Sequence, residues 1–128
     1  MQRNTFTKKE KLCKKSIVDQ LIHGKNNSKF TEYPLLCIWK EQELDTHYPA
    51  QIMISVGKRM QKKAINRNRI KRQIREIYRQ RKSHLYDHLK IQNKQIAIIF
   101  LFVSKEMVPF NKLEDSIGKI IEKLIKMV

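Results

Sequence analysis

The 128-residue chain has little of several residue types, and each shortage excludes a class of protein. Its two cysteines, Cys13 and Cys37, are too few for a disulfide scaffold and suit a reducing compartment. Three glycines cannot build a glycine-rich phosphate loop. The longest apolar run, Ile96–Val103, is too short to cross a bilayer, and Met1–Phe6 lacks the apolar stretch of a secretory signal. We therefore expect one cytoplasmic domain over residues 1–128, with no membrane partner.

Acidic residues are also scarce, because 12 Asp and Glu stand against 28 Lys and Arg. The net charge is +16 and the isoelectric point is about 10.1. A charge of this size repels itself, and a polyanion is the kind of partner that neutralises it. At 41% hydrophobic residues the chain is too apolar for a disordered basic tail. The composition predicts a folded domain that associates with nucleic acid.

Most of the positive charge lies in one segment, residues 58–82. This segment holds twelve basic residues and one acid, Glu76, and seven of the eight arginines of the chain. Arginine presents a rigid fork that suits bidentate contacts with phosphates, whereas lysine is a flexible point charge. The concentration of arginine in this segment indicates a surface whose contacts require a defined geometry.

Hydrophobic periodicity predicts an α+β fold in which helices pack on a mixed sheet of about four strands. The Arg-rich helix lies between strand-like segments and must therefore cross over the sheet. A polar loop follows the first helix, and an acidic turn over residues 41–49 joins two strands. The expected elements are a helix over 8–23, strands over 33–39 and 50–56, a helix over 64–81, a strand over 96–103, and a last helix after Pro109.

The Arg-rich helix separates into two faces when its residues are spaced at 100°. The apolar arc holds Ile70, Ile74, Ile77 and Tyr78, the opposite side holds Asn68, Lys71, Arg72, Arg75 and Arg79, and Arg67 and Arg69 flank the boundary. Like charges at these spacings destabilise an isolated helix, which is explained if phosphates lie across them. A solvated charged face is the alternative, but it usually carries mixed charges. A membrane-surface helix is a further alternative, but the apolar arc would then have to contact lipid and pack in the core at the same time.

Ser55–Arg59 reads SVGKR and Ala64–Glu76 reads AINRNRIKRQIRE. These residues resemble the bacterial ribonuclease P protein subunit. That family has an Arg-Asn-Arg motif, then Lys-Arg and a further Arg, on a helix that follows an S-V-x-K-K strand end. A first helix ending in His23-Gly24, the apolar strand, and a short last helix after Phe110 also resemble the family, so the likeness covers nearly the whole chain.

The resemblance implies an α-β-β-β-α-β-α sandwich with a left-handed β-α-β crossover, against the general right-handed preference. It implies the protein component of an endoribonuclease that removes the 5′ leader from precursor tRNA. The implied partners are the ribonuclease P RNA and precursor tRNA, with no protein partner. The RNA subunit would hold the catalytic Mg²⁺, so we expect no protein-bound cofactor or metal and no catalytic protein side chain.

Two groups of binding residues follow from the resemblance. Ile17 and Leu21 stand where the family has a Phe-x-x-x-Phe pair, Trp39 falls where it often has a cleft tyrosine, and Met60–Lys63 is one residue longer than the usual turn. For the catalytic RNA we expect contacts from Arg67, Asn68, Arg69, Lys71, Arg72, Arg75 and Arg79, and for the leader from Ile17, Leu21, Trp39, Ser55, Lys58 and Arg59.

Other chemistry has weaker support in the sequence. His84 and His88 are four residues apart but lack a third ligand nearby, and the acids of Glu41–Asp45 are expected in a solvated turn. Cys13 and Cys37 are expected as buried thiols. A structural RNA-binding protein of the ribosomal type, without a processing role, remains the alternative function. A DNA-binding module is disfavoured because the basic helix has no preceding helix-turn partner.

Overall fold

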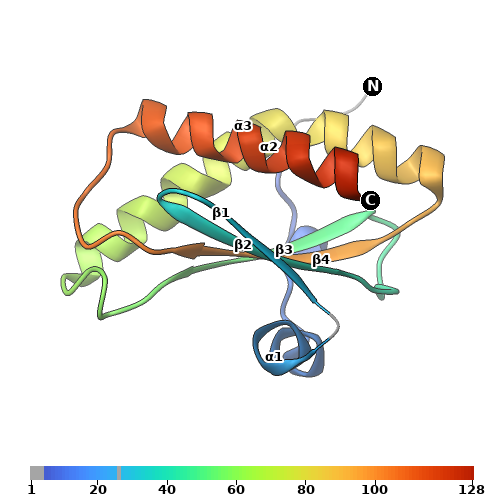
Figure 1. Cartoon of the computed structure of the whole chain (residues 1–128), viewed down its shortest axis with the longest axis horizontal. Coiled ribbons are helices and arrows are strands. Elements are labelled where there is room, and N and C mark those ends of the chain that lie inside the picture. Colours follow the sequence, from blue (N-terminus) through green and yellow to red (C-terminus); the bar gives the residue numbers. More distant parts are fainter. Residues whose placement is uncertain (1–4, 26) are drawn as a thin grey trace.

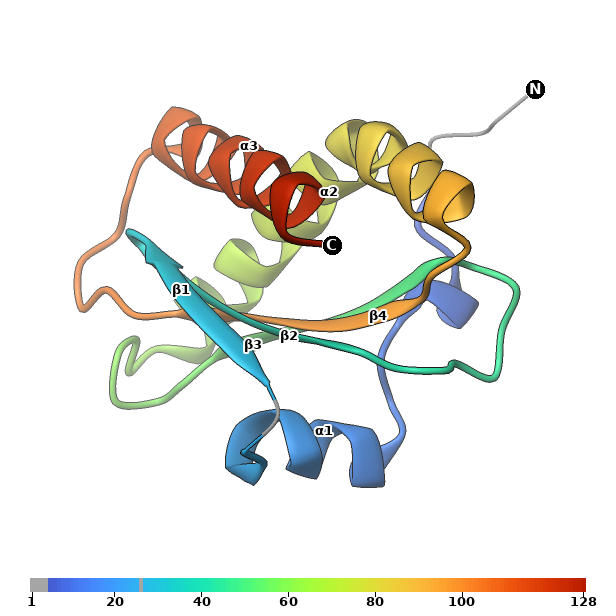
Figure 2. The same ribbon diagram turned by 45° about the vertical axis from the view of Figure 1, so that its right-hand side comes forward.

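A four-stranded sheet separates two helical layers of unequal size (Figures 1 and 2). The computed structural model of the chain describes residues 5–25 and 27–128. Two long helices, α2 and α3, cover one face, and the short helix α1 crosses the other. The elements in chain order are a 3-10 turn η1 (Lys8–Glu10), α1 (Lys15–His23), β1 (Ser28–Glu32), β2 (Leu35–Glu41), β3 (Ala50–Val56), α2 (Ala64–Gln92), β4 (Ile96–Phe102) and α3 (Phe110–Met127).

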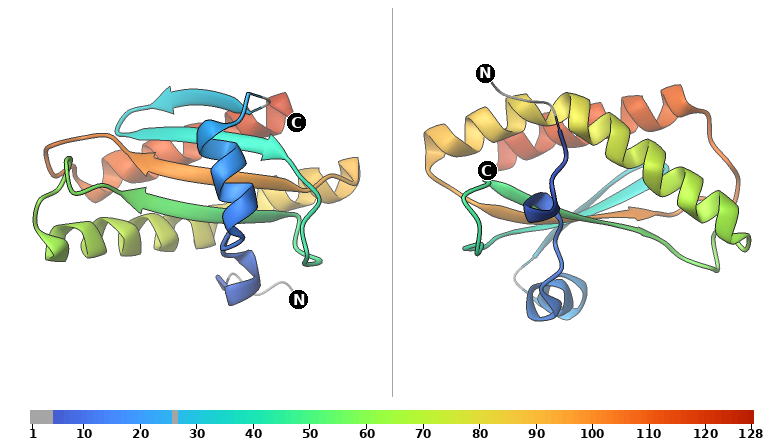
Figure 3. Two further views of the ribbon diagram at one scale, coloured as in Figure 1. Left: turned by 90° about the horizontal axis from the view of Figure 1, so that it is seen from below. Right: turned by 180° about the vertical axis from the view of Figure 1, so that it is seen from behind.

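The strand order is β1-β2-β4-β3, with β4 inserted between two strands that precede it in the chain. β4 pairs antiparallel with β2 and parallel with β3. Figure 3 (left) shows the sheet from the α1 side, with α2 behind it and both parallel strands pointing to the left. When this view is turned so that the two strands point up, β4 lies to the right of β3. The β3–α2–β4 connection is therefore left-handed, which confirms the expected fold.

The sheet is apolar on both faces because helices cover both. Alternate residues of β4 point to opposite sides: Phe100 belongs to the main core under α2 and α3, and Ile99 to a smaller cluster under α1. This explains the continuous apolar run of the last strand. β2 alternates in the same way, with Cys37 in the main core and Ile38 in the smaller cluster.

The expected first helix is interrupted in the structure. Residues 11–14 run beside β3 instead, where the backbone N–H of Leu12 donates to the carbonyl of Ile52 at 2.8 Å. Leu12 is buried in the smaller cluster. The apolar spacing over 8–23 therefore comes from a sheet-edge contact followed by a nine-residue helix.

The Arg-rich helix is longer than predicted, since it continues to Gln92 and ends at Asn93 in the left-handed conformation (φ 54°). Leu85 and Leu89 extend its buried side, but a buried lysine, Lys82, stands between them and the apolar arc. Because lysine is normally exposed, Lys82 interrupted the apolar spacing, and the predicted helix ended before it. β1 was expected as a polar loop, because among its five residues only Phe30 packs against the core.

Two glycines with ordinary backbone angles have opposite surroundings. A Cβ on Gly24, which ends α1, would stand 2.2 Å from the carbonyl oxygen of Gln20, whereas a Cβ on Gly57 would meet nothing within 4 Å. We expect Gly24→Ala to lower the free energy of unfolding by about 1–3 kcal/mol through this clash. The matched control Gly57→Ala should stay within about 1 kcal/mol of wild type, on the stabilising side. Urea denaturation followed by circular dichroism measures both, and equal losses would contradict the clash.

Candidate nucleic-acid interface

The basic face of α2 is held outward by the burial of its opposite side. Ile74 and Ile77 are fully buried in the main core, and Ile70 and Tyr78 are buried beside them. Their burial fixes the rotation of the helix about its own axis. Asn68, Arg69, Arg72 and Arg75 are exposed and Lys71 is half-buried, as the helical spacing predicted. The first turn of α2 contains no acidic residue, so no side chain there offsets the positive end of the helix dipole.

Arg67 is engaged by the backbone rather than pointing freely to solvent. Its Nη1 donates to the carbonyls of Gln61 and Lys62, at 2.9 Å each. Gln61 is buried, and its amide donates to the carbonyl of Ser104 at 3.2 Å. These contacts hold the longer turn that the sequence showed between β3 and α2. In the structure Arg67 therefore positions the turn that presents Lys58 to solvent, and its contact with RNA stays a prediction.

Arg79, at the far end of the basic face, is paired with Glu76. Its guanidinium donates to the two carboxylate oxygens from Nη2 at 2.6 Å and from Nε at 3.1 Å. These hydrogen bonds lower the pKa of Glu76, which is therefore ionised at neutral pH. A phosphate at Arg79 would compete with this carboxylate. Among residues 5–25 and 27–128, no acidic side chain forms an ion pair with Arg69, Lys71, Arg72 or Arg75 of this face.

A second candidate surface lies on the sheet face that α1 covers only in part. Ile17 and Leu21 attach α1 to the sheet and are themselves buried in the smaller cluster. Beside them one row of residues crosses all four strands in register and stays exposed or half-buried. The row consists of Thr31, Leu36, Leu101 and Ser55. This row is therefore a candidate surface for single-stranded RNA next to α1.

Trp39 was expected to contact the leader together with Ile17 and Leu21, but the structure places it on the opposite face of the sheet from them. Trp39 shares the β2 face of Leu35 and Cys37, as period-two alternation required, but that face belongs to the main core under α2 and α3. Its exposed fraction is 8%. Both alternating sets of β2 are apolar, so the sequence did not show which set faces α1. The structure adds Leu36 and Leu101 to the candidate residues, because the alternating set of β2 that contains Leu36 faces α1 and pairs with Leu101 of β4.

The remaining predicted leader residues lie at one end of the sheet. Ser55 belongs to the row described above, and the exposed Lys58 and Arg59 follow directly in the turn after β3. The structure therefore brings Ser55, Lys58 and Arg59 to the same end of the sheet. Ile17 and Leu21 are buried between α1 and the sheet beside the row, so they are not part of its exposed surface.

Within residues 5–25 and 27–128 no three His, Cys, Asp or Glu side chains are grouped to hold a metal ion. His88 Nε2 lies 2.9 Å from the carbonyl of Val128, and Glu41 pairs with Lys94 at 3.2 Å. Burial raises the pKa of the Cys37 thiol, as expected for a buried cysteine. Cys13 is exposed, so its predicted burial is wrong. No helix in the described part of the chain is long and apolar enough to span a membrane.

A cationic helix face and an open row on a small sheet define a basic α+β protein of the RNA-binding type. The family model described as "Ribonuclease P" matches residues 6–125. A "Ribonuclease P protein component" of Porphyromonas gingivalis is 32% identical over 90 residues, which are 70% of this chain and 66% of that protein, slightly under two thirds of its length. The chain belongs to the ribonuclease P protein family.

Solved structures agree with this fold. The RNase P protein of Staphylococcus aureus matches with a TM-score of 0.68 at 20% identity, over 89% of this chain and 94% of that one. The RNase P protein from Thermotoga maritima matches with a TM-score of 0.64 at 20% identity, over 89% and 96%. At these identities the likeness establishes the fold alone.

The cationic face is tested by the salt dependence of RNA binding. Each phosphate that a cation neutralises releases a counterion, so Arg72→Ala should lower the slope of log K against log salt by roughly 1. The control is Arg81→Ala, which removes the same charge from the side of α2 opposite Arg72. Arg81 lies 3.6 Å from Glu114 and is outside the basic face. Titrations with ribonuclease P RNA at several salt concentrations give the slopes. Equal slopes for Arg72→Ala and wild type would show that the face is only solvated.

Proposed function

We propose that the chain is the protein subunit of ribonuclease P, and that it assists the endonucleolytic removal of the 5′ leader from precursor tRNA in the cytoplasm. The observation that carries the proposal is the exposed cationic face of α2, with Arg69 and Arg72 outside and Ile70 and Ile74 buried beneath. It presents the Arg-Asn-Arg motif of the family in a fixed orientation. In this proposal the face binds the catalytic RNA through its phosphates.

The chemical step is assigned to the RNA partner. By the family resemblance, the RNA subunit holds the Mg²⁺ ions that activate water, and the protein adds binding energy and charge neutralisation. Two polyanions repel each other, so a protein with a net charge of +16 lets catalytic RNA and precursor approach at a lower Mg²⁺ concentration. The contribution of the protein is thus largest where divalent ions are scarce.

The leader is proposed to cross the open row of the sheet beside α1. Leu36 and Leu101 offer an apolar surface at its centre, Ser55 offers a hydroxyl, and Lys58 and Arg59 supply cations at the end. Aromatic side chains would stack on bases, but this row contains none. The leader is therefore held by apolar contact and phosphate pairing, with little dependence on base identity.

Reconstitution tests the proposed function. At low Mg²⁺, precursor tRNA should be cleaved at the leader junction by ribonuclease P RNA with the protein, and far more slowly by the RNA without it. The protein without RNA should cleave nothing, because its contribution is binding. Gel analysis of the 5′-labelled precursor gives the rates. Binding to the RNA with no gain in cleavage would favour a structural RNA-binding protein of the ribosomal type.

The leader row is tested by two substitutions on opposite faces of the sheet. Leu101→Ala, in the row, should reduce the preference of the holoenzyme for leader-bearing precursor over mature tRNA by roughly threefold to tenfold, from about 1 kcal/mol of lost apolar contact. Trp39→Ala, in the main core, should lower the free energy of unfolding by about 3–5 kcal/mol. It should leave the preference unchanged for folded protein. Thermal melting and paired affinity measurements separate the two, and a selective leader effect of Trp39→Ala would reverse the assignment.

A further inference from the structure

The segment over residues 5–14, here called the strap, connects the two faces of the molecule. It starts beside α2, passes the free edge of β3 and leads into α1 on the opposite face (Figure 3, right). Along this edge the N–H of Leu12 donates to the Ile52 carbonyl at 2.8 Å, and the Gln51 side chain donates to the Lys9 carbonyl at 2.9 Å. The strap therefore connects α2, which it contacts, with α1, which directly follows it in the chain.

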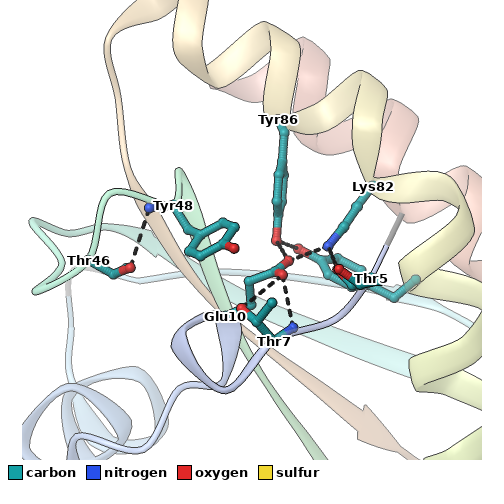
Figure 4. A network of polar contacts seen from close by, with 8 residues as sticks. Thr5, Thr7, Glu10, Thr46, Tyr48, Lys82 and Tyr86 are labelled. Carbon is teal, nitrogen blue, oxygen red and sulfur yellow. Dashed lines mark hydrogen bonds and ion pairs between the residues drawn. The ribbon is translucent and has the colours of Figure 1, made fainter. Parts of the chain in front are cut away.

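A buried ion pair attaches the strap to α2 (Figure 4). The Glu10 carboxylate lies 2.5 Å from the Lys82 ammonium, and the exposed fractions of the two side chains are 0% and 6%. The same carboxylate oxygen accepts the Tyr86 hydroxyl at 2.6 Å, while the other accepts the backbone N–H and the hydroxyl of Thr7 at 3.0 and 3.2 Å. Lys82 also donates to the carbonyl of Thr5. The Lys82 ammonium, both carboxylate oxygens of Glu10 and the Tyr86 hydroxyl therefore all have partners.

A buried ion pair contributes little net stability, because desolvation of both charges offsets their attraction. Its directional contacts select one register instead. The strap needs such a selection, since its apolar anchors are few and face opposite ways. Phe6 packs against the main core and meets Tyr78 edge-on at 6.0 Å, whereas Leu12 lies in the smaller cluster. A shift of the strap along β3 would move these two anchors out of their clusters.

The strap also borders the basic face of α2. Lys71 and Arg75 of that face line one groove of about 230 Å³ together with Lys11 and Cys13 of the strap. A change in the position of the strap therefore alters the spacing between the basic face and α1. α1 has nine residues and is too short to hold a place by itself, so it depends on the strap and on its contacts with the sheet.

We propose that Glu10 and Lys82 are positioning residues that fix the place of α1 beside the proposed leader row. Their ion pair locks the register of the strap, and the strap sets where α1 begins beside the row. This inference rests on the proposed function. Neither residue contacts RNA, because both side chains are buried. They act through the placement of α1.

The test replaces Lys82 by methionine, which keeps the length of the side chain and removes its charge. In Lys82→Met, hydrogen exchange should accelerate in residues 5–14 and stay unchanged in β4. The preference of the holoenzyme for leader-bearing precursor over mature tRNA should fall about tenfold, or about 1.4 kcal/mol. The affinity for ribonuclease P RNA should stay within about twofold. The matched control is Lys90→Met, which removes the same charge from an exposed position on α2 and should leave all three measurements unchanged.

A second variant separates positioning from stability. Lys82→Met leaves the Glu10 carboxylate buried without its cation and should lower the melting temperature. Glu10→Gln with Lys82→Met removes both buried charges, so its melting temperature should return toward wild type while the leader preference stays low. Recovery of both together would show a merely structural role and overturn the inference. A leader preference that survives in Lys82→Met would overturn the inference alone. A wild-type holoenzyme without any leader preference would overturn the proposed leader row and the inference with it.

Discussion

The burial of one side of α2 against the sheet is the contact on which the rest of the structure depends. Arginines and lysines one helical turn apart repel each other, and an isolated helix with this sequence would be weak. Ile74, Ile77 and Leu89 have no exposed surface, and their packing offsets this repulsion. The same packing decides which side of the helix meets solvent. The stability of the core and the orientation of the cationic face therefore have one physical origin.

The central position of β4 has a second consequence, because this strand supplies side chains to the apolar clusters on both faces of the sheet. Phe100 on one side and Ile99 on the other anchor the two helical layers, so each layer is placed relative to the same strand. The cationic helix covers one face of the sheet, and the open row beside α1 lies on the other face. The strap around the edge of β3, attached through Glu10 and Lys82, is the further connection between them.

Much of the fold was predictable from local signals. The strand over residues 50–56 and the last helix after Pro109 were predicted where they lie, because strong apolar periodicity stands between clear breaks. β1 carried no such signal, because its side chains are mostly exposed and polar. Its backbone pairing with β2 holds it in the sheet. The extension of α2 was hidden by Lys82, a charged residue whose partner lies 72 positions away in the chain. Contacts between distant segments leave no periodic pattern in a sequence.

The sequence by itself determined the membership of a basic RNA-binding class, the apolar arc of α2 and the exposure of Arg69, Arg72 and Arg75, because helical geometry relates neighbours three and four apart. Only the tertiary structure decided which face of β2 meets α1, and so placed Trp39 in the core and Leu36 in the open row. It also decided that Arg67 and Arg79 have protein partners. Alternation along a strand defines two faces but not what covers each of them, and that depends on where the chain returns from afar.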